Sequence, residues 1–250
     1  DLSLDDLKAF RRLNSKTPGH PEYKKTPGVE MTTGPLGQGF ATAVGYAIAE
    51  KHTEALINKK EKVIDYNIYC LCGDGDLMEG VSYEAASLAG SLKLDNLIVL
   101  YDSNKTTMDG KIDNVFDEDI TKRFESMNWN VLTTSDEPQD IDDAIIKAKE
   151  ADKPTIIQVA TTIGKDSSLA DSNKSHSGCF DKEEVTKIKT TLGVRDIPFT
   201  ISNEAVEEFR SYIKERNKDL VTNFDEIKEM LDEFYDKMCL FTHSTIFVNA

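Results

Sequence analysis

The chain has 250 residues, of which 39% are hydrophobic, and this is enough to bury one sizeable core. Its formal net charge of −15 repels phosphate backbones and argues against nucleic-acid binding. No run of 18 apolar residues occurs, so no membrane span is expected. Cys70 and Cys72 alternate along one apolar run, and we expect them to be buried free thiols of a reducing compartment.

The chain is predicted to begin with a helix over residues 3–13. Ser3 can cap this helix, and Leu4, Leu7 and Phe10 recur at helical spacing. The stretch 14–35 is rich in Gly and Pro and has no periodicity, and loops of this length in compact domains are usually functional or disordered. A second helix is predicted over residues 38–57.

A strand, a helix and a second strand are predicted next, over residues 68–72, 81–94 and 97–101. Units of this kind are right-handed and make their two strands parallel. Asp74 and Asn104 are therefore expected just past the carboxyl ends of neighbouring strands, where open α/β sheets bind ligands.

The residue types at these two positions predict a metal site. Asp74 offers an anionic oxygen and Asn104 a neutral one, and Mg²⁺ prefers about six oxygen ligands, usually including phosphate and water. Gly73 and Gly75 leave room for backbone N–H groups to approach a phosphate. A divalent cation holding a diphosphate is thus one interpretation, and a plain Gly-Asp-Gly turn is the other.

Helices over residues 117–127 and 141–151 alternate with strands over residues 129–133 and 155–161. This alternation predicts a doubly wound, mostly parallel α/β sheet with helices on both faces. Three acidic helices are predicted after it, over residues 181–191, 203–217 and 223–238. We therefore expect a diphosphate-binding domain over residues 1–190 and a truncated helical extension or linker over residues 191–250.

Longer sequence motifs surround the candidate metal residues Asp74 and Asn104. Gly-Asp-Gly, then about thirty residues, then Asn after an apolar strand resembles the thiamine-diphosphate signature. The words that resemble the transketolase family are GDGDLMEG, EAASLAGSLKL, LIVLYDSN, SKTPGHPE (residues 15–22) and GVEMTTGPLGQGFATAVGYAIAE (residues 28–50). The resemblance runs nearly without a gap from residue 2 to about residue 176 and is weak beyond residue 190.

The resemblance implies an enzyme of the pentose phosphate pathway. Its members use thiamine diphosphate and Mg²⁺ (or Ca²⁺) to transfer a two-carbon ketol unit from a ketose phosphate to an aldose phosphate. They are cytoplasmic homodimers whose active sites lie at the chain–chain interface, because a separate domain of the partner supplies the glutamate that activates the aminopyrimidine. The present chain looks like a fragment without that domain, so alone it is expected to bind Mg-diphosphate weakly and to show no ketol transfer.

The resemblance also implies roles for particular residues. The metal ligands would be Asp74, Asn104 and the backbone carbonyl of Thr106. Catalytic, substrate-facing roles are implied for His20 and His176. The cofactor contacts would be Gly34, Leu36, Asp74, Gly75, Glu79, Asn104, Met108, Ile163 and His176. Glu79 would also contact the partner's activating glutamate, although a carboxylate at a helix start is favoured by the helix dipole alone.

Several alternatives remain open. A deoxyxylulose-phosphate synthase or a pyruvate-dehydrogenase-type enzyme shares the cofactor, but the GHPE and LMEG words disfavour both. A haloacid-dehalogenase-type phosphatase needs an Asp-x-Asp word after an upstream strand, and none precedes residue 74. The third alternative is a non-catalytic fragment or binding module. Around His176 the words depart from the family, with Gly164-Lys-Asp-Ser-Ser and His176-Ser-Gly-Cys-Phe in place of its usual sequences.

Overall fold

The computed structural model describes residues 2–58, 62 and 64–216. The chain forms two compact units, one made of Asp1–Ala49 and Tyr66–Asp196 and the other of Glu50–Asp65 and Ile197–Ala250. The sheet and every candidate site residue lie in the first unit. Within the described ranges, no helix has both the length and the apolar character that crossing a membrane requires.

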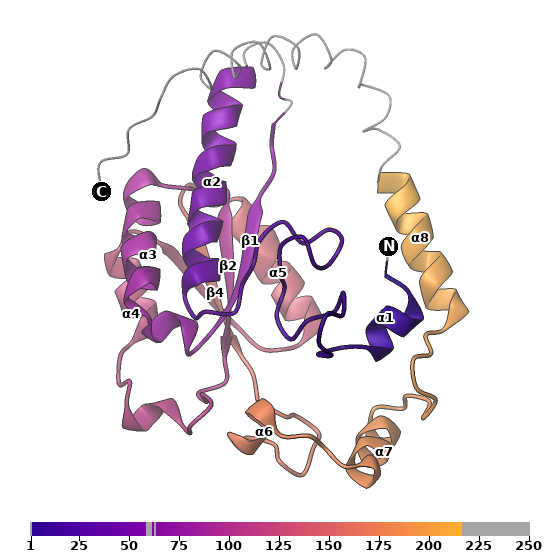
Figure 1. Ribbon diagram of the computed structural model, residues 1–250. Coiled ribbons are helices and arrows are strands. Elements are labelled where there is room, and N and C mark those ends of the chain that lie inside the picture. The colour runs from indigo at the N-terminus through magenta and orange to yellow at the C-terminus, as the bar shows by residue number, and fades with distance from the viewer. Residues whose placement is uncertain (1, 59–61, 63, 217–250) are drawn as a thin grey trace. The chain divides into compact units, whose positions relative to one another are not determined.

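A four-stranded parallel sheet forms the centre of the first unit (Figure 1). Its strands are β1 (Ile68–Gly73), β2 (Leu97–Ser103), β3 (Asn130–Thr134) and β4 (Thr155–Ala160), in the spatial order β1-β2-β4-β3. The predicted parallel α/β sheet is thereby confirmed. Gly73 of β1 pairs with Asp102 of β2, so the two strands end at the same edge of the sheet.

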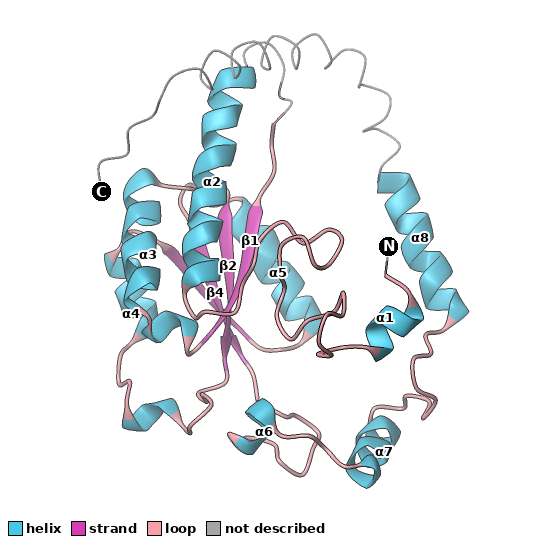
Figure 2. Ribbon diagram, viewed as in Figure 1, coloured by secondary structure: helices cyan, strands magenta, loops and turns pink. Residues whose placement is uncertain are grey.

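Helices cover both faces of this sheet (Figure 2). On one face, α2 (Gln38–Ile57), α3 (Gly80–Leu92) and α4 (Ile120–Ser126) contribute Phe40, Ala86 and Phe124 to the larger core cluster. On the other face, α5 (Pro138–Lys149) packs Ala144 and Ala148 against Ile98 and Ile157. Burial of these apolar side chains is the main force that holds the helices to the sheet.

Close packing between α3 and the segment after α4 fixes the position of the helix that follows the Asp74 loop. The indole of Trp129 donates a hydrogen bond of 2.8 Å to the Ala86 carbonyl, and its ring stacks on Phe40. A Cβ on Gly90 would lie 1.8 Å from the Met127 carbonyl oxygen, so only glycine allows this approach.

The first helix is shorter than predicted. Ser3 caps α1 (Leu4–Lys8) and forms a capping box with Asp6, as its sequence position suggests. The prediction that the helix continues to residue 13 is wrong, because Arg11 adopts φ +62° and its N–H bonds to the Thr17 carbonyl instead of continuing the helix.

The remaining helices follow the predicted order. They are α7 (Lys182–Thr191) and α8 (Asn203–Arg216). A short helix, α6 (Lys174–Ser177), precedes them, in the polar stretch of residues 163–180 that the sequence predicts as a loop, and 3₁₀ turns occur at Asp76–Met78 and Ile112–Asn114. The helix predicted over residues 223–238 lies outside the described residues. The domain boundary at residues 190–191 stays a prediction.

Candidate functional site

Asp74 follows β1 directly and its side chain is buried, with 3% of the residue exposed. The hydroxyl of Tyr101 donates to its Oδ1 over 2.5 Å, and the backbone N–H of Lys105 donates to its Oδ2 over 2.8 Å. Burial and then the hydrogen bond to Asp74 raise the pKa of Tyr101, so the phenol stays protonated and acts as the donor. No ion pair with another described residue balances the Asp74 carboxylate. A buried carboxylate without a counter-charge is costly, and a bound cation removes that cost.

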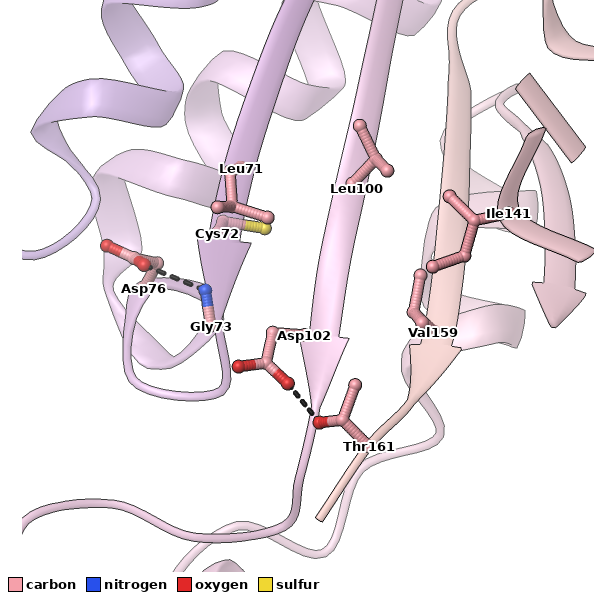
Figure 3. A pocket seen from close by; sticks show the side chains of 9 residues that line it. All are labelled: Leu71, Cys72, Gly73, Asp76, Leu100, Asp102, Ile141, Val159 and Thr161. Atoms are coloured by element: carbon pink, nitrogen blue, oxygen red, sulfur yellow. Dashed lines mark hydrogen bonds between the residues drawn. The ribbon is translucent and has the colours of Figure 1, made fainter. Parts of the chain in front are cut away.

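Asn104 follows β2 and is held by its neighbours. Its Nδ2 donates to Asp102 Oδ2 over 3.2 Å, and its Oδ1 accepts from the Thr106 N–H over 3.0 Å. The other oxygen of Asp102 accepts from the hydroxyl of Thr161, which follows β4 (Figure 3). Asp102 thereby fixes which way the Asn104 amide faces.

Thr106 is buried at 5% exposure, in the tight turn that follows Asn104. An isolated antiparallel bridge pairs it with Lys111, and the hydrogen bonds of that bridge run through the flanking residues. Its own carbonyl oxygen accepts no hydrogen bond from any residue that the structure describes. A buried carbonyl needs a partner, so this oxygen is available to a ligand.

The candidate ligands for a divalent cation are the oxygen atoms of Asp74, Asn104 and Thr106. The described part of the chain holds no group of three or more His, Cys, Asp and Glu side chains suited to a metal. The oxygens of Asp74, Asn104 and Thr106 are hard ligands for Mg²⁺, and phosphate or water oxygens would have to complete the shell of about six. The site therefore suits a metal that arrives with a phosphorylated ligand.

A second loop approaches the Asp74 turn from the start of α2. Gly34 lies against the imidazole of His20, since a Cβ on Gly34 would be 3.3 Å from His20 Cγ. Leu36 lies over Gly75, whose Cβ position is 3.2 Å from Leu36 Cδ1. The structure thus places four of the predicted site residues in adjacent positions, and Leu36 remains 53% exposed for contact with a ligand.

Glu79 stands at the N-terminal cap of α3, and its side chain is exposed. It forms no capping hydrogen bond, so capping does not account for it. Gly37 adopts φ +79° beside it, and a Cβ there would lie 2.9 Å from Glu79 Cβ. The Glu79 carboxylate therefore lies beside the loop that carries Leu36 and is not used in capping α3.

Residues 162–177 lie against the loop that carries Thr106. Asn173 Nδ2 donates to the Met108 carbonyl over 3.3 Å, and Lys111 forms an ion pair with Asp171. The Ile163 carbonyl accepts from the Asp171 N–H over 2.9 Å. The loop thus lies against the segment of Met108 and Lys111 that follows Thr106, despite its unusual sequence. His176 is exposed in α6, and its imidazole has no hydrogen bond to Asp74, Asn104 or any other described residue.

A pocket of about 430 Å³ opens at the same carboxyl edge (Figure 3). Gly73, Asp76, Asp102 and Thr161 form its polar part, and its apolar part is lined by Leu71, Cys72, Leu100, Ile141 and Val159. Sequence reasoning missed Asp76, Tyr101 and Asp102, although all three stand inside the motifs that it used. The only available signal was their position beside Asp74 and Asn104.

A parallel α/β sheet with oxygen atoms and glycine-containing loops gathered at its carboxyl edge is the class of fold that binds ligands at that edge, and these oxygens suit a cation with a diphosphate. The family model described as "Transketolase, thiamine diphosphate binding domain" matches residues 1–242. The chain belongs to this family of transketolase domains.

Individual relatives agree with this assignment. A transketolase of Aquifex aeolicus is 50% identical over 218 residues, which are 86% of this chain and 32% of that protein. The structure of transketolase from Leishmania mexicana has a TM-score of 0.90 and 38% identity, over 97% of this chain and 37% of that one. A Pichia stipitis transketolase in complex with sedoheptulose-7-phosphate has a TM-score of 0.88 and 37% identity, over 95% and 36% of the two chains. The chain thus spans about a third of the length of the relatives that it matches.

Proposed function

We propose that the complete gene product that contains this chain is a transketolase. It would transfer a two-carbon ketol unit from a ketose phosphate to an aldose phosphate, with thiamine diphosphate and Mg²⁺ as cofactors. The observation that carries the proposal is the buried, uncompensated Asp74 carboxylate at the end of β1, next to Asn104 and the free Thr106 carbonyl, in a chain of this family. A relative that binds sedoheptulose-7-phosphate supports a sugar phosphate as substrate.

In this proposal Asp74, Asn104 and the Thr106 carbonyl hold the cation, which in turn holds the diphosphate. Bound thiamine diphosphate supplies a nucleophilic carbon and an electron sink for breaking and forming the bond next to a ketose carbonyl. Gly34, Leu36, Gly75, Met108 and Ile163 would form the walls that orient the cofactor. Leu36 and Met108 are more than half exposed, which leaves their side chains open to such a contact.

The polar residues around these walls would handle protons and substrate hydroxyls. His20 lies beside Gly34, one of the proposed walls. His176 lies in α6, which begins one residue after the Asn173 whose amide contacts Met108. Both side chains are exposed, and neither has a hydrogen-bond partner among the described residues. They are the candidates for substrate binding and proton transfer in this chain.

The proposal includes a homodimer whose active site lies between chains. Glu79 would contact a carboxylate of the partner there, and the absence of a capping hydrogen bond leaves its side chain free to do so. A cytoplasmic location is also proposed. It agrees with the free thiols of Cys70, Cys72 and Cys179, which are typical of a reducing compartment.

A coupled assay on the purified complete gene product tests the activity. The protein is supplied with a ketose phosphate donor, an aldose phosphate acceptor, Mg²⁺ and thiamine diphosphate, and the shortened and lengthened sugars are quantified. We expect multiple turnovers that cease without either cofactor. Tight cofactor binding without ketol transfer would contradict transketolase activity and would instead indicate a binding module or another thiamine-diphosphate enzyme.

A further inference from the structure

Asp76 connects two loops that are far apart in the sequence. Its Oδ1 accepts a hydrogen bond of 2.9 Å from the Gly37 N–H, and its Oδ2 accepts one of 2.9 Å from the Gly73 N–H. Figure 3 shows the second of these bonds, at the end of β1. The Asp76 backbone is held as well, because the hydroxyl of Ser82 donates to its carbonyl over 2.6 Å.

Both carboxylate oxygens of Asp76 therefore face backbone N–H groups. Hydrogen bonds from N–H groups to a carboxylate are about twice as strong as bonds between neutral groups. This arrangement differs from that of Asp74, whose carboxylate lies among the candidate metal ligands. The Asp76 carboxylate thus joins two loops and does not serve as a second candidate metal ligand.

The loop of residues 34–37, which Asp76 joins to the end of β1, has little room to move. At Gly37, a Cβ would lie 2.8 Å from Ser82 Oγ and 2.9 Å from Val81 Cγ1, so the backbone is pressed against the start of α3. One residue earlier, Leu36 contacts Gly75. The hydrogen bond from the Gly37 N–H to Asp76 therefore keeps Leu36 in contact with the turn that carries Asp74.

We propose that Asp76 is a positioning residue for the cofactor. It fixes the loop of residues 34–37, which would contact the rings of thiamine diphosphate, to the loop of residues 73–75, which would contact its diphosphate. This inference rests on the proposed function. Because the clamp joins the two halves of the site, its loss should weaken binding of a ligand that spans both halves and spare a ligand that occupies only one.

The test compares two ligands by calorimetry in the complete gene product at saturating Mg²⁺. In the proposed binding mode thiamine diphosphate would span both loops, whereas inorganic diphosphate would reach only the cation and the turn that carries Asp74. In Asp76→Asn, we expect the affinity for thiamine diphosphate to fall about ten- to a hundredfold, the typical effect of losing a hydrogen bond to a charged group. The affinity for inorganic diphosphate should stay within about threefold, or rise because a nearby negative charge is removed.

Asp142→Asn is the matched control, since Asp142 is an exposed acid on α5 without a partner among the described residues, and both affinities should remain unchanged. An equal loss of both ligands in Asp76→Asn would overturn the inference and place Asp76 at the metal. An unchanged thiamine-diphosphate affinity would overturn it too. If the wild-type protein binds no thiamine diphosphate, the proposed function fails and the inference falls with it.

A folding defect is measured separately by thermal unfolding of the ligand-free proteins. If Asp76→Asn does not fold, Asp76→Glu carries the test, because it keeps the charge but displaces the oxygens by about one bond length, ~1.5 Å. It should show the same selective loss of thiamine diphosphate. Failure of both variants to fold would mean that Asp76 serves the fold as a whole, and would overturn its assignment to cofactor positioning.

Discussion

The Tyr101 hydroxyl donates a hydrogen bond of 2.5 Å to Asp74 Oδ1, and this bond links the C-terminal part of β2 to the residue that follows β1. Tyr101 is 1% exposed, so water cannot replace this donor. With the Lys105 N–H on the other oxygen, the bond leaves the Asp74 carboxylate a single orientation. The orientation of the candidate metal ligand thus depends on a residue outside the metal site itself.

Replacement of this donor should affect the metal more than the fold. In Tyr101→Phe the ring still fills its place in the core, but Asp74 loses the donor to Oδ1. We expect the Mg²⁺ affinity measured in the presence of thiamine diphosphate to fall by about tenfold, the lower end of the effect of removing a group that hydrogen-bonds to a metal ligand. Calorimetry of Mg²⁺ binding measures it. Wild-type affinity in Tyr101→Phe would show that Asp74 needs no such support.

The approach of α3 to the Met127 carbonyl predicts a large difference between two glycines. Gly90→Ala should destabilise the protein by about 3 kcal/mol, because a Cβ 1.8 Å from a backbone oxygen forces the elements apart. Gly45 in α2 is the matched control, since nothing lies within 4 Å of its Cβ position. Gly45→Ala should stabilise by about 1 kcal/mol through helix propensity. Equal unfolding midpoints in denaturant for the two variants would contradict the packing described here.

The cysteines should differ in reactivity. Burial raises the pKa of Cys70 from 9.0 to about 12 and raises that of Cys72 as well. At pH 8 the reactive thiolate of Cys70 is therefore about a thousandfold rarer than that of an ordinary thiol. Cys179 is exposed and should be alkylated first, with Cys70 and Cys72 reacting only after unfolding. Peptide mapping by mass spectrometry after timed alkylation measures this, and rapid labelling of Cys70 in the native protein would contradict it.

The altered loop around His176 leads to a kinetic prediction. If the imidazole moves a proton during turnover, His176→Ala should lower kcat by about a hundredfold or more while the unfolding midpoint stays unchanged, because the side chain is exposed and unbonded. The complete gene product is assayed at saturating cofactor. A variant with full kcat would show that His176 takes no part in the reaction.

The sequence predicted the elements well where apolar periodicity decides the structure. The predicted helix over residues 38–57 matches α2 residue for residue, and the four strands differ from prediction by one or two residues at their ends. The first helix was predicted too long because its apolar pattern continues to residue 13, whereas the chain turns at Arg11 through a backbone bond to Thr17. Such a turn leaves no trace in the spacing of side chains.

The site was predicted only in part, for a related reason. Asp74 and Asn104 lie just past β1 and β2 because parallel strands end at one edge, which the motif order already implies. Their partners depend on the register between strands. Tyr101 reaches Asp74 because Gly73 pairs with Asp102, and Asp76 reaches Gly37 because α2 begins beside α3. Neither relationship can be obtained from distances along the chain.

Asp74 is the residue that we propose holds the divalent cation, which in turn would bind the diphosphate. Calorimetric titration of thiamine diphosphate into the complete gene product, with and without Mg²⁺, for wild type and Asp74→Ala, tests it most directly. We predict Mg²⁺-dependent binding by the wild-type protein and none by Asp74→Ala, because the substitution removes the only charged ligand of the set. Equal affinity of the two proteins for thiamine diphosphate in the presence of Mg²⁺ would contradict the claim.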